Sequence, residues 1–330
     1  MANKLLTVAI PAYNVENFIE DTVLSIEECK YSDLIEIIII NDGSSDHTAL
    51  VCEKIIKRFS NVIVVNKDNG GHGSAINTGI AEANGKYFRL LDGDDWFNTK
   101  ELDCYISILK NETADIVLTD YVEVLIKSGV NRPMSFYSGV LPEYSRMKMD
   151  EVDFKKWGPM LPATTIKTSL LKQAKFHIDE HCYYVDQEYN FLCLTKSKTL
   201  AYYPMMIYMY RLERDGQSME RGSLIRNVNS HERVCARLLE EYYKIKDSLP
   251  KNKKDYIEQR MIIPLCHMQY QIAIEYCKSR KDFLSFDRIL KKYKDFYNHP
   301  GVVSRMVKLH RKTGGATVSK HQEIRNIISK

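Results

Sequence analysis

The chain has 330 residues, a formal net charge of +4, and hydrophobic and charged fractions of 44% and 27%. These values are ordinary for a soluble globular protein and leave room for one large domain or two smaller ones. No stretch reaches the ~18 uncharged apolar residues that a membrane span needs, and residues 1–6 are too short and too polar for a signal peptide. We therefore expect a cytoplasmic protein, and the small net charge gives no indication of a nucleic-acid partner.

The first third of the chain alternates between strand-like and helix-like segments. Continuous apolar runs predict strands at 5–10, 35–40, 62–65, 87–91 and 116–119. Apolar residues at helical spacing predict helices at 17–28, 51–59, 74–83 and 100–110. This alternation indicates an α/β fold, with a mostly parallel sheet that is flanked by helices.

The rest of the chain divides into two parts. Extended segments are expected at 121–144 and 200–211, and helices at 168–174 and 186–195. After Ser223 the pattern is helical to the end. We expect an α/β domain over residues 1–220 and a helical C-terminal region over 221–330.

Polar residues follow each of the first four predicted strands. The segments are Pro11–Asn14, Asn41–Asp46, Asn66–Gly73 and Asp92–Asp95. Ligands bind beyond the carboxyl ends of the strands in such sheets, so the four segments together predict one binding site.

Asp92-Gly93-Asp94 is the most informative of these segments. Two carboxylates at a strand end can hold a hard divalent cation, and Mn²⁺ or Mg²⁺ there could also contact a diphosphate. The alternative is an acidic turn that caps the helix starting near Thr99. In the segment Asn41–Asp46, we expect Asp42 to face a ligand and Asp46 to cap a helix.

Gly71-His72-Gly73 resembles part of a dinucleotide-binding fingerprint, with an acidic residue about twenty residues further on. Ile76 stands where the third glycine is required, and the segment follows the third strand rather than the first. This argues against a nicotinamide enzyme. His72 could act as a general base, donate to phosphates or have no role.

Taken in order, Val8–Asn14, Asn41–Asp46, Asn69–Asn77 and Asp92–Asp95 resemble the family 2 inverting glycosyltransferases, which have the GT-A fold. The resemblance covers roughly the first 120 residues and resumes more loosely over 183–218. It implies transfer of a sugar from a nucleotide-diphosphate donor, usually a UDP-sugar, to an acceptor hydroxyl with inversion of configuration. A saccharide or lipid-linked acceptor in bacterial surface polysaccharide synthesis is the expectation at the level of the family.

The resemblance also implies roles for individual residues. Pro11, Ala12, Tyr13, Asn69 and Gly70 would line the nucleotide pocket, Asp42 would contact the base, Asp92 would lie near the ribose and the metal, and Asp94 would be the direct metal ligand. Arg211 resembles the basic residue that meets the diphosphate, ahead of Gln217-Ser218. The rings of Trp157, Tyr183 and Tyr184 could face a sugar.

Asp186 falls where the family places its catalytic base, although Val185 replaces the usual glutamate before it. Its position at a predicted helix N-terminus should favour the ionised form. The alternatives are that Asp186 only caps the helix, or that Glu188 or, less directly, Asp179 is the base. Two other functions stay open, a nucleotidyltransferase and a non-catalytic module that binds sugar nucleotides.

The last segment of the chain is basic. Its cations are Arg305, Lys308, Arg311, Lys312, Lys320, Arg325 and Lys330, against the single acid Glu323. It could make a peripheral contact with an anionic membrane, at the inner face, or form a solvated helix face.

Overall fold

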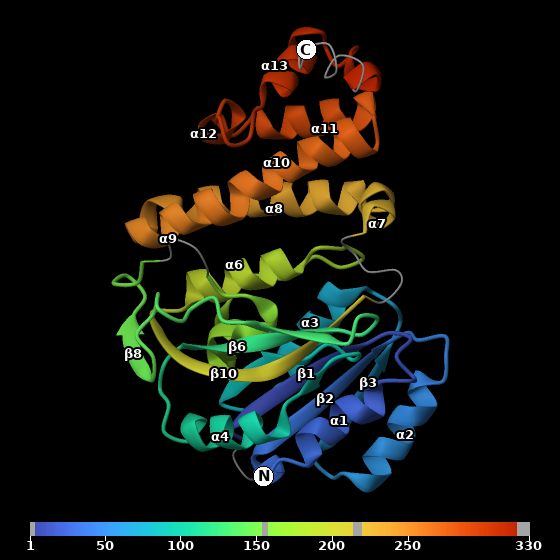
Figure 1. The fold of residues 1–330 in the computed structure, drawn as a ribbon, viewed down its shortest axis with the longest axis vertical. Helices are drawn as coiled ribbons and strands as arrows, with labels where there is room; N and C mark the ends of the chain where they lie inside the picture. Colours follow the sequence, from blue (N-terminus) through green and yellow to red (C-terminus); the bar gives the residue numbers. More distant parts are fainter. Residues whose placement is uncertain (1–3, 154–157, 214–219, 322–330) are drawn as a thin grey trace. The chain divides into compact units, whose positions relative to one another are not determined.

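The structure is a computed structural model that describes residues 4–153, 158–213 and 220–321 (Figure 1). The chain forms two compact units, Met1–Arg214 and Asp215–Lys330. The first unit contains the sheet and the second is helical.

The first unit is built on a sheet with the strand order β3-β2-β1-β4-β9-β6-β10-β5. The bounds are β1 Leu6–Ala12, β2 Ile35–Asp42, β3 Val62–Lys67, β4 Tyr87–Leu90, β5 Trp96–Phe97, β6 Ile116–Leu125, β9 Thr164–Lys167 and β10 Thr199–Leu212. Two further strands, β7 (Val130–Met134) and β8 (Ser145–Lys148), pair with β6 and β10. The five strands predicted from apolar runs are confirmed.

Helices cover both faces of this sheet (Figure 1). Their bounds are α1 Ile19–Glu27, α2 Thr48–Arg58, α3 His72–Glu82, α4 Thr99–Leu109, α5 Thr168–Gln173 and α6 Asp186–Lys196. Every residue of β2 is buried, as expected for a strand covered on both sides. Helix α3 packs on β1 and β2, whereas α1 packs against α2 and α4.

Strands β3, β2, β1 and β4 run parallel to one another, so their carboxyl ends meet at one edge. The second half of the sheet is mixed, because β9 lies antiparallel between β4 and β6. The sequence pattern does not predict β9, since its threonines break the apolar run. Their hydroxyls are nevertheless used inside the sheet, where Thr165 accepts from the buried guanidinium of Arg89 at 3.0 Å.

The predicted extended segment at 200–211 is strand β10, which runs parallel to β6. Its register shifts on either side of Met206, close after Pro204. Proline cannot donate to a strand ladder, which accounts for an irregularity at this point. Beyond it, β10 continues to Leu212 and carries Tyr208, Tyr210 and Arg211 towards the acidic turn after β4.

The second unit is helical, as predicted. Its α-helices are α7 Arg221–Arg226, α8 Val228–Ile245, α9 Lys251–Tyr256, α10 Ile263–Gln271, α11 Arg280–Leu290, α12 Lys294–Tyr297 and α13 Arg305–Lys312. Within the parts of the chain that the structure describes, we find no helix with the length and apolar character needed to span a bilayer.

The basic C-terminal segment is only partly a charged surface. Arg305, Lys308 and Lys312 on α13 are exposed. Arg311 instead turns inward, where its Nε lies 2.6 Å from Asp287 Oδ1 and its guanidinium stacks on Tyr297. Arg311 therefore does not belong to the predicted solvated cations. Arg325, Lys330 and Glu323 lie outside the described residues.

Candidate active site

The loops that follow β1 and β2 are joined by side-chain hydrogen bonds. The Asn14 side chain accepts the Ser45 N–H at 2.8 Å, and Asn14 has a positive φ of 53°. Just before it, Ala12 is buried, Pro11 is partly buried and the Tyr13 ring is 53% exposed. The strand end therefore offers an open aromatic ring beside a fixed backbone.

At two helices in this region, N–H groups of the first turn donate to residues other than Asp92 and Asp94. The Asp46 carboxylate accepts the N–H of Thr48, the first residue of α2, which confirms its structural role. The side chain of Asn98 caps α4, which starts at Thr99. The acidic turn at 92–95 is thus not the cap of that helix, and this alternative is wrong.

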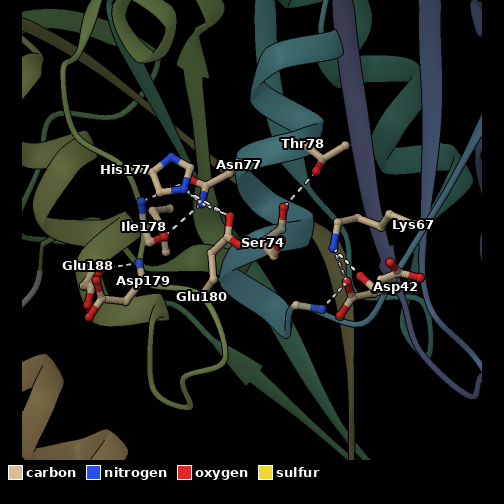
Figure 2. Close-up of polar contacts among 12 residues, drawn as sticks. Asp42, Lys67, Ser74, Asn77, Thr78, His177, Ile178, Asp179, Glu180 and Glu188 are labelled. Carbon is tan, nitrogen blue, oxygen red and sulfur yellow. Dashed lines mark hydrogen bonds and ion pairs between the residues drawn. The ribbon is translucent and has the colours of Figure 1, made fainter.

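Asp42, at the end of β2, is the centre of a hydrogen-bonded cluster (Figure 2). Its Oδ1 accepts from Lys67 Nζ at 2.7 Å and from the Gly70 N–H at 2.9 Å, and its Oδ2 accepts the Gly71 N–H at 2.8 Å. The Asn69 amide donates to the Asp42 carbonyl at 2.9 Å. A carboxylate offers about four acceptor positions, so the cluster uses three of them and leaves one on a side chain that is 4% exposed.

The Asp92-Gly93-Asp94 turn after β4 is fixed by the neighbouring elements. The Gly93 N–H donates to the Pro11 carbonyl at 3.1 Å, and the Thr22 hydroxyl of α1 donates to the Gly93 carbonyl at 3.1 Å. A Cβ on Gly93 would lie 2.9 Å from the Pro11 oxygen. The close approach to β1 requires glycine, and it leaves Asp92 and Asp94 partly exposed.

Strand β10 holds this turn from the other side through Asp95. The buried Asp95 carboxylate accepts from the Tyr208 hydroxyl at 2.7 Å and from the Arg211 N–H at 2.7 Å. The same Tyr208 oxygen accepts the Asp92 N–H at 3.2 Å. Burial raises the pKa of Asp95 well above its ordinary value, and the charges of Asp94 and Asp92 raise it further.

Arg211 is held beside the acidic turn in one orientation. Its Nε donates to the Asp94 carbonyl at 2.7 Å. Its guanidinium carbon lies 4.8 Å from the Phe18 ring centroid and 4.7 Å from that of Trp96. Two ring faces and a hydrogen bond thus place a permanent cation next to Asp94.

His72, the first residue of α3, faces the turn across the site. Its Nε2 lies 3.1 Å from Asp92 Oδ1, and the two side chains are 35% and 32% exposed. Burial lowers the pKa of His72, but the hydrogen bond to Asp92 and the charges of Asp92, Asp186 and Asp94 outweigh it and raise the pKa overall. His72 therefore responds to carboxylates from both halves of the first unit.

Asp186 is the first residue of α6 and belongs to the same group of charges. Its Oδ2 accepts from the Gln187 side chain at 2.9 Å, and the N-cap of α6 is Val185, with no side-chain capping bond. The role as a helix cap is therefore not observed. Burial raises the pKa of Asp186, and this outweighs Gln187, His72 and the backbone N–H groups, which lower it. The backbone N–H groups thus favour the ionised form, as expected, but burial has the larger effect on the pKa.

The two reserve candidates for the base are bonded to one another. Glu188 is fully buried, and its Oε2 accepts the Asp179 N–H at 2.9 Å. An acceptor hydroxyl cannot reach a carboxylate that is closed off from solvent. Burial therefore disfavours Glu188, whereas Asp186 and Asp179 are both partly exposed.

Among the described residues, no group of three or more histidine, cysteine, aspartate or glutamate side chains is arranged to hold a metal ion. Asp92 and Asp94 nevertheless fit a hard cation, because Mg²⁺ commonly uses one or two carboxylates and completes its shell with substrate phosphates and water. The turn also concentrates three carboxylates within four residues.

Comparison with known proteins decides the family. Residues 7–179, more than half of the chain, match the family described as glycosyl transferase family 2. The chain belongs to this family. Its sheet with flanking helices is the GT-A fold.

Relatives in family 2 cover parts of the chain. This chain is 38% identical over 113 residues to the uncharacterized glycosyltransferase EpsJ of Bacillus subtilis (strain 168), and the match covers 34% of this chain and 33% of that protein. It is 27% identical over 218 residues to a poly(ribitol-phosphate) beta-glucosyltransferase of Bacillus spizizenii, covering 65% and 33%. The chain thus spans about a third of the length of these curated relatives.

Among solved structures, the fold is similar to residues 1–349 of TarS from S. aureus in complex with UDP-GlcNAc. The TM-score is 0.60 at 18% identity, and the match covers 94% of this chain and 92% of that one. At this identity the likeness concerns the fold alone.

The family resemblance assigns no role to several neighbours of the site. Lys67, Tyr208 and Asn77 make specific hydrogen bonds to the candidate residues or to the loop that leads to them, although Asn77 ends one of the segments that carry the resemblance. Lys67 is a polar residue at a strand end, and this was its only signal. Trp157, Gln217 and Ser218 lie outside the described residues.

Proposed function

We propose that this family 2 enzyme transfers a sugar from a UDP-sugar to an acceptor hydroxyl in one in-line displacement with inversion. The observation that carries the proposal is the acidic turn after β4, where Asp94 adjoins Arg211 and Asp92 lies 3.1 Å from His72, whose pKa is also raised by the charge of Asp186. A carboxylate base opposite a diphosphate site is what a single displacement needs. We assign donor binding and catalysis to residues 1–220, with 221–330 as a helical C-terminal region.

The nucleotide is held in this proposal by the loops after β1, β2 and β3. Asp42 has acceptor capacity left, and Lys67 Nζ stands beside it as a donor. An acceptor next to a donor matches the N–H and carbonyl edge of uracil. Pro11, Ala12 and the exposed Tyr13 ring form the adjoining wall.

The diphosphate is held by the acidic turn and its neighbours. Asp94, assisted by Asp92, would hold Mn²⁺ or Mg²⁺, and the bound ion would stabilise the negative charge on the departing nucleoside diphosphate. Arg211 supplies a second cation beside Asp94, and its stacked guanidinium needs little reorganisation to meet phosphate oxygens.

Asp186 takes the proton from the acceptor hydroxyl as the new bond forms. Because burial raises its pKa, it is a stronger base than an exposed aspartate. The attack comes from the face opposite the leaving group, so an α-linked donor gives a β-linked product. The exposed Tyr183 ring lies close before Asp186 in the chain and could face the acceptor sugar.

The acceptor class is supported only by the name of a relative. A relative is named a poly(ribitol-phosphate) beta-glucosyltransferase, which agrees with a saccharide or lipid-linked acceptor in surface polysaccharide synthesis. A nucleotidyltransferase is disfavoured, since Pro11–Asn14 has neither a glycine-rich loop nor a basic residue.

A thermal-shift panel tests the donor. UDP-glucose, UDP-galactose and UDP-GlcNAc are compared with GDP-mannose, each with and without Mn²⁺. A ligand at a hundred times its Kd stabilises the folded protein by about 2.7 kcal/mol. We expect stabilisation by UDP-sugars with Mn²⁺ and release of UDP, not pyrophosphate. Binding without UDP release for any acceptor tried would instead indicate a non-catalytic module.

A further inference from the structure

One face of α3 is bonded to the loop at 177–182, which precedes α6 (Figure 2). The Asn77 amide bonds both backbone groups of Ile178. Its Nδ2 donates to the Ile178 carbonyl at 2.8 Å, and its Oδ1 accepts the Ile178 N–H at 3.1 Å. The same Nδ2 also faces His177 Nε2 at 3.0 Å and Glu180 Oε1 at 3.4 Å. Asn77 thus pairs with the loop as a neighbouring strand would.

Glycines let the loop approach α3 along the same face. A Cβ on Gly73 would lie 2.1 Å from the Asp179 carbonyl oxygen, which leaves room only for glycine, and Gly71 just before α3 has a positive φ of 82°. The His181 N–H donates to the Gly70 carbonyl. These contacts and those of Asn77 form what we call the α3 seam.

The α3 seam is connected to the candidate site at both of its ends. At one end, Gly70 and Gly71 donate their N–H groups to Asp42. At the other end, the Asp179 N–H donates to Glu188, which is buried in the first turn of α6. That turn begins with Asp186. The loop between the seam and α6 also holds His181 and Tyr184 at positive φ angles of 50° and 68°, a conformation that non-glycine residues keep only when their surroundings hold them.

We propose that Asn77 is a positioning residue for Asp186, which it holds in place through Ile178, Asp179 and Glu188. The inference rests on the proposed function, in which Asp186 is the base. In this proposal Asn77 acts through the loop and not by contact with the donor or the reacting atoms. It sets where the carboxylate stands relative to the diphosphate site, and a misplacement of about 1 Å can lower a rate by about a hundredfold.

The test compares Asn77→Ala with Thr78→Ala. Thr78 is the next residue on α3, and among the residues that the structure describes its hydroxyl bonds only within the helix, to the Ser74 carbonyl at 2.9 Å. The readouts are the rate of UDP release from the UDP-sugar identified by the donor panel, the Kd for UDP with Mn²⁺, and the melting temperature. We expect Asn77→Ala to lower kcat by roughly tenfold to a hundredfold with an unchanged Kd. Thr78→Ala should keep wild-type values.

A double-mutant cycle with Asp186→Asn separates positioning from a general structural role. If Asn77 acts through Asp186, Asn77→Ala should cost little more once Asp186 is already asparagine. Equal fold losses in both backgrounds, or a wild-type rate for Asn77→Ala, would overturn the proposal. Should Asn77→Ala fail to fold, Asn77→Ser replaces it with the same criteria, since serine keeps a hydroxyl for one Ile178 group. A fully active Asp186→Asn would overturn the base assignment instead, so the two failures are distinguishable.

Discussion

Replacing Tyr208 with phenylalanine removes one buried oxygen and leaves the ring in place. That oxygen donates to Asp95 at 2.7 Å and accepts the Asp92 N–H at 3.2 Å. The ring keeps its edge contact with Phe97, at 6.0 Å between centroids. The loss therefore comes from two hydrogen bonds and not from packing.

Tyr208→Phe leaves the buried Asp95 carboxylate without one donor and the partly buried Asp92 N–H without its acceptor. The buried group should cost about 1–3 kcal/mol, and the partly buried bond about 0.5–1.5 kcal/mol, which together make about 1.5–4.5 kcal/mol. For a unit of this size, that corresponds to a melting temperature lowered by about 3–18 °C.

The assay is thermal unfolding of the full chain, followed by circular dichroism, with Tyr210→Phe as the matched control. Tyr210 lies two residues further along β10, and its hydroxyl forms no hydrogen bond among the described residues. We expect the control to unfold close to wild type. Equal melting temperatures for the two variants would show that Tyr208 does not tie β10 to the acidic turn.

Three further predictions follow from the structure. Asp94→Ala should abolish Mn²⁺-dependent UDP binding, measured by calorimetry, without lowering the melting temperature; wild-type binding in the variant or in chelator would rule out the metal role. The pKa of Asp115 lies below its ordinary 3.8. Burial raises this pKa, but the hydrogen bonds from Lys167 and from backbone N–H groups lower it by more. The stabilisation by Asp115 is present above pH 3.8 and is lost as the pH falls towards the lowered pKa. Asp115→Asn should therefore destabilise the protein at pH 7 and progressively less below pH 3.8 in urea titrations, and a loss that does not change with pH would contradict this. Replacing the exposed cations Arg305, Lys308 and Lys312 by glutamine should weaken sedimentation with anionic vesicles by about 1 kcal/mol per charge and leave UDP release unchanged; no vesicle binding by the wild type at low salt would show a solvated helix face.

The first half of the site could be predicted from the sequence because its residues follow strands. Parallel strands bring their carboxyl ends to one edge, so Pro11, Asp42 and Asp92 had to lie near one another. The apolar runs that precede them are long enough to identify the strands. The buried Ile35–Ile40 run is the clearest case, since it also showed that both faces of the sheet are covered.

The second half could not be predicted in this way, because its contacts join residues far apart in the chain without any periodic pattern. Tyr208 meets Asp95 through one hydrogen bond, and Asn77 meets Ile178 through two. Strand β9 was not predicted because its threonines are buried but polar, so they do not form an apolar run. Asp186 was found only through the family resemblance, and its pKa depends on burial that no local sequence reports.

The most direct test of the central claim is the rate of UDP release from a UDP-sugar by wild type and Asp186→Asn, measured beside the Kd for UDP with Mn²⁺. The substitution keeps the shape of the side chain and removes the proton acceptor. We predict a rate lowered roughly a hundredfold to ten-thousandfold, with a Kd that is nearly unchanged. A wild-type rate in Asp186→Asn would contradict the account, because the carboxylate that approaches His72 from α6 would then not be the base.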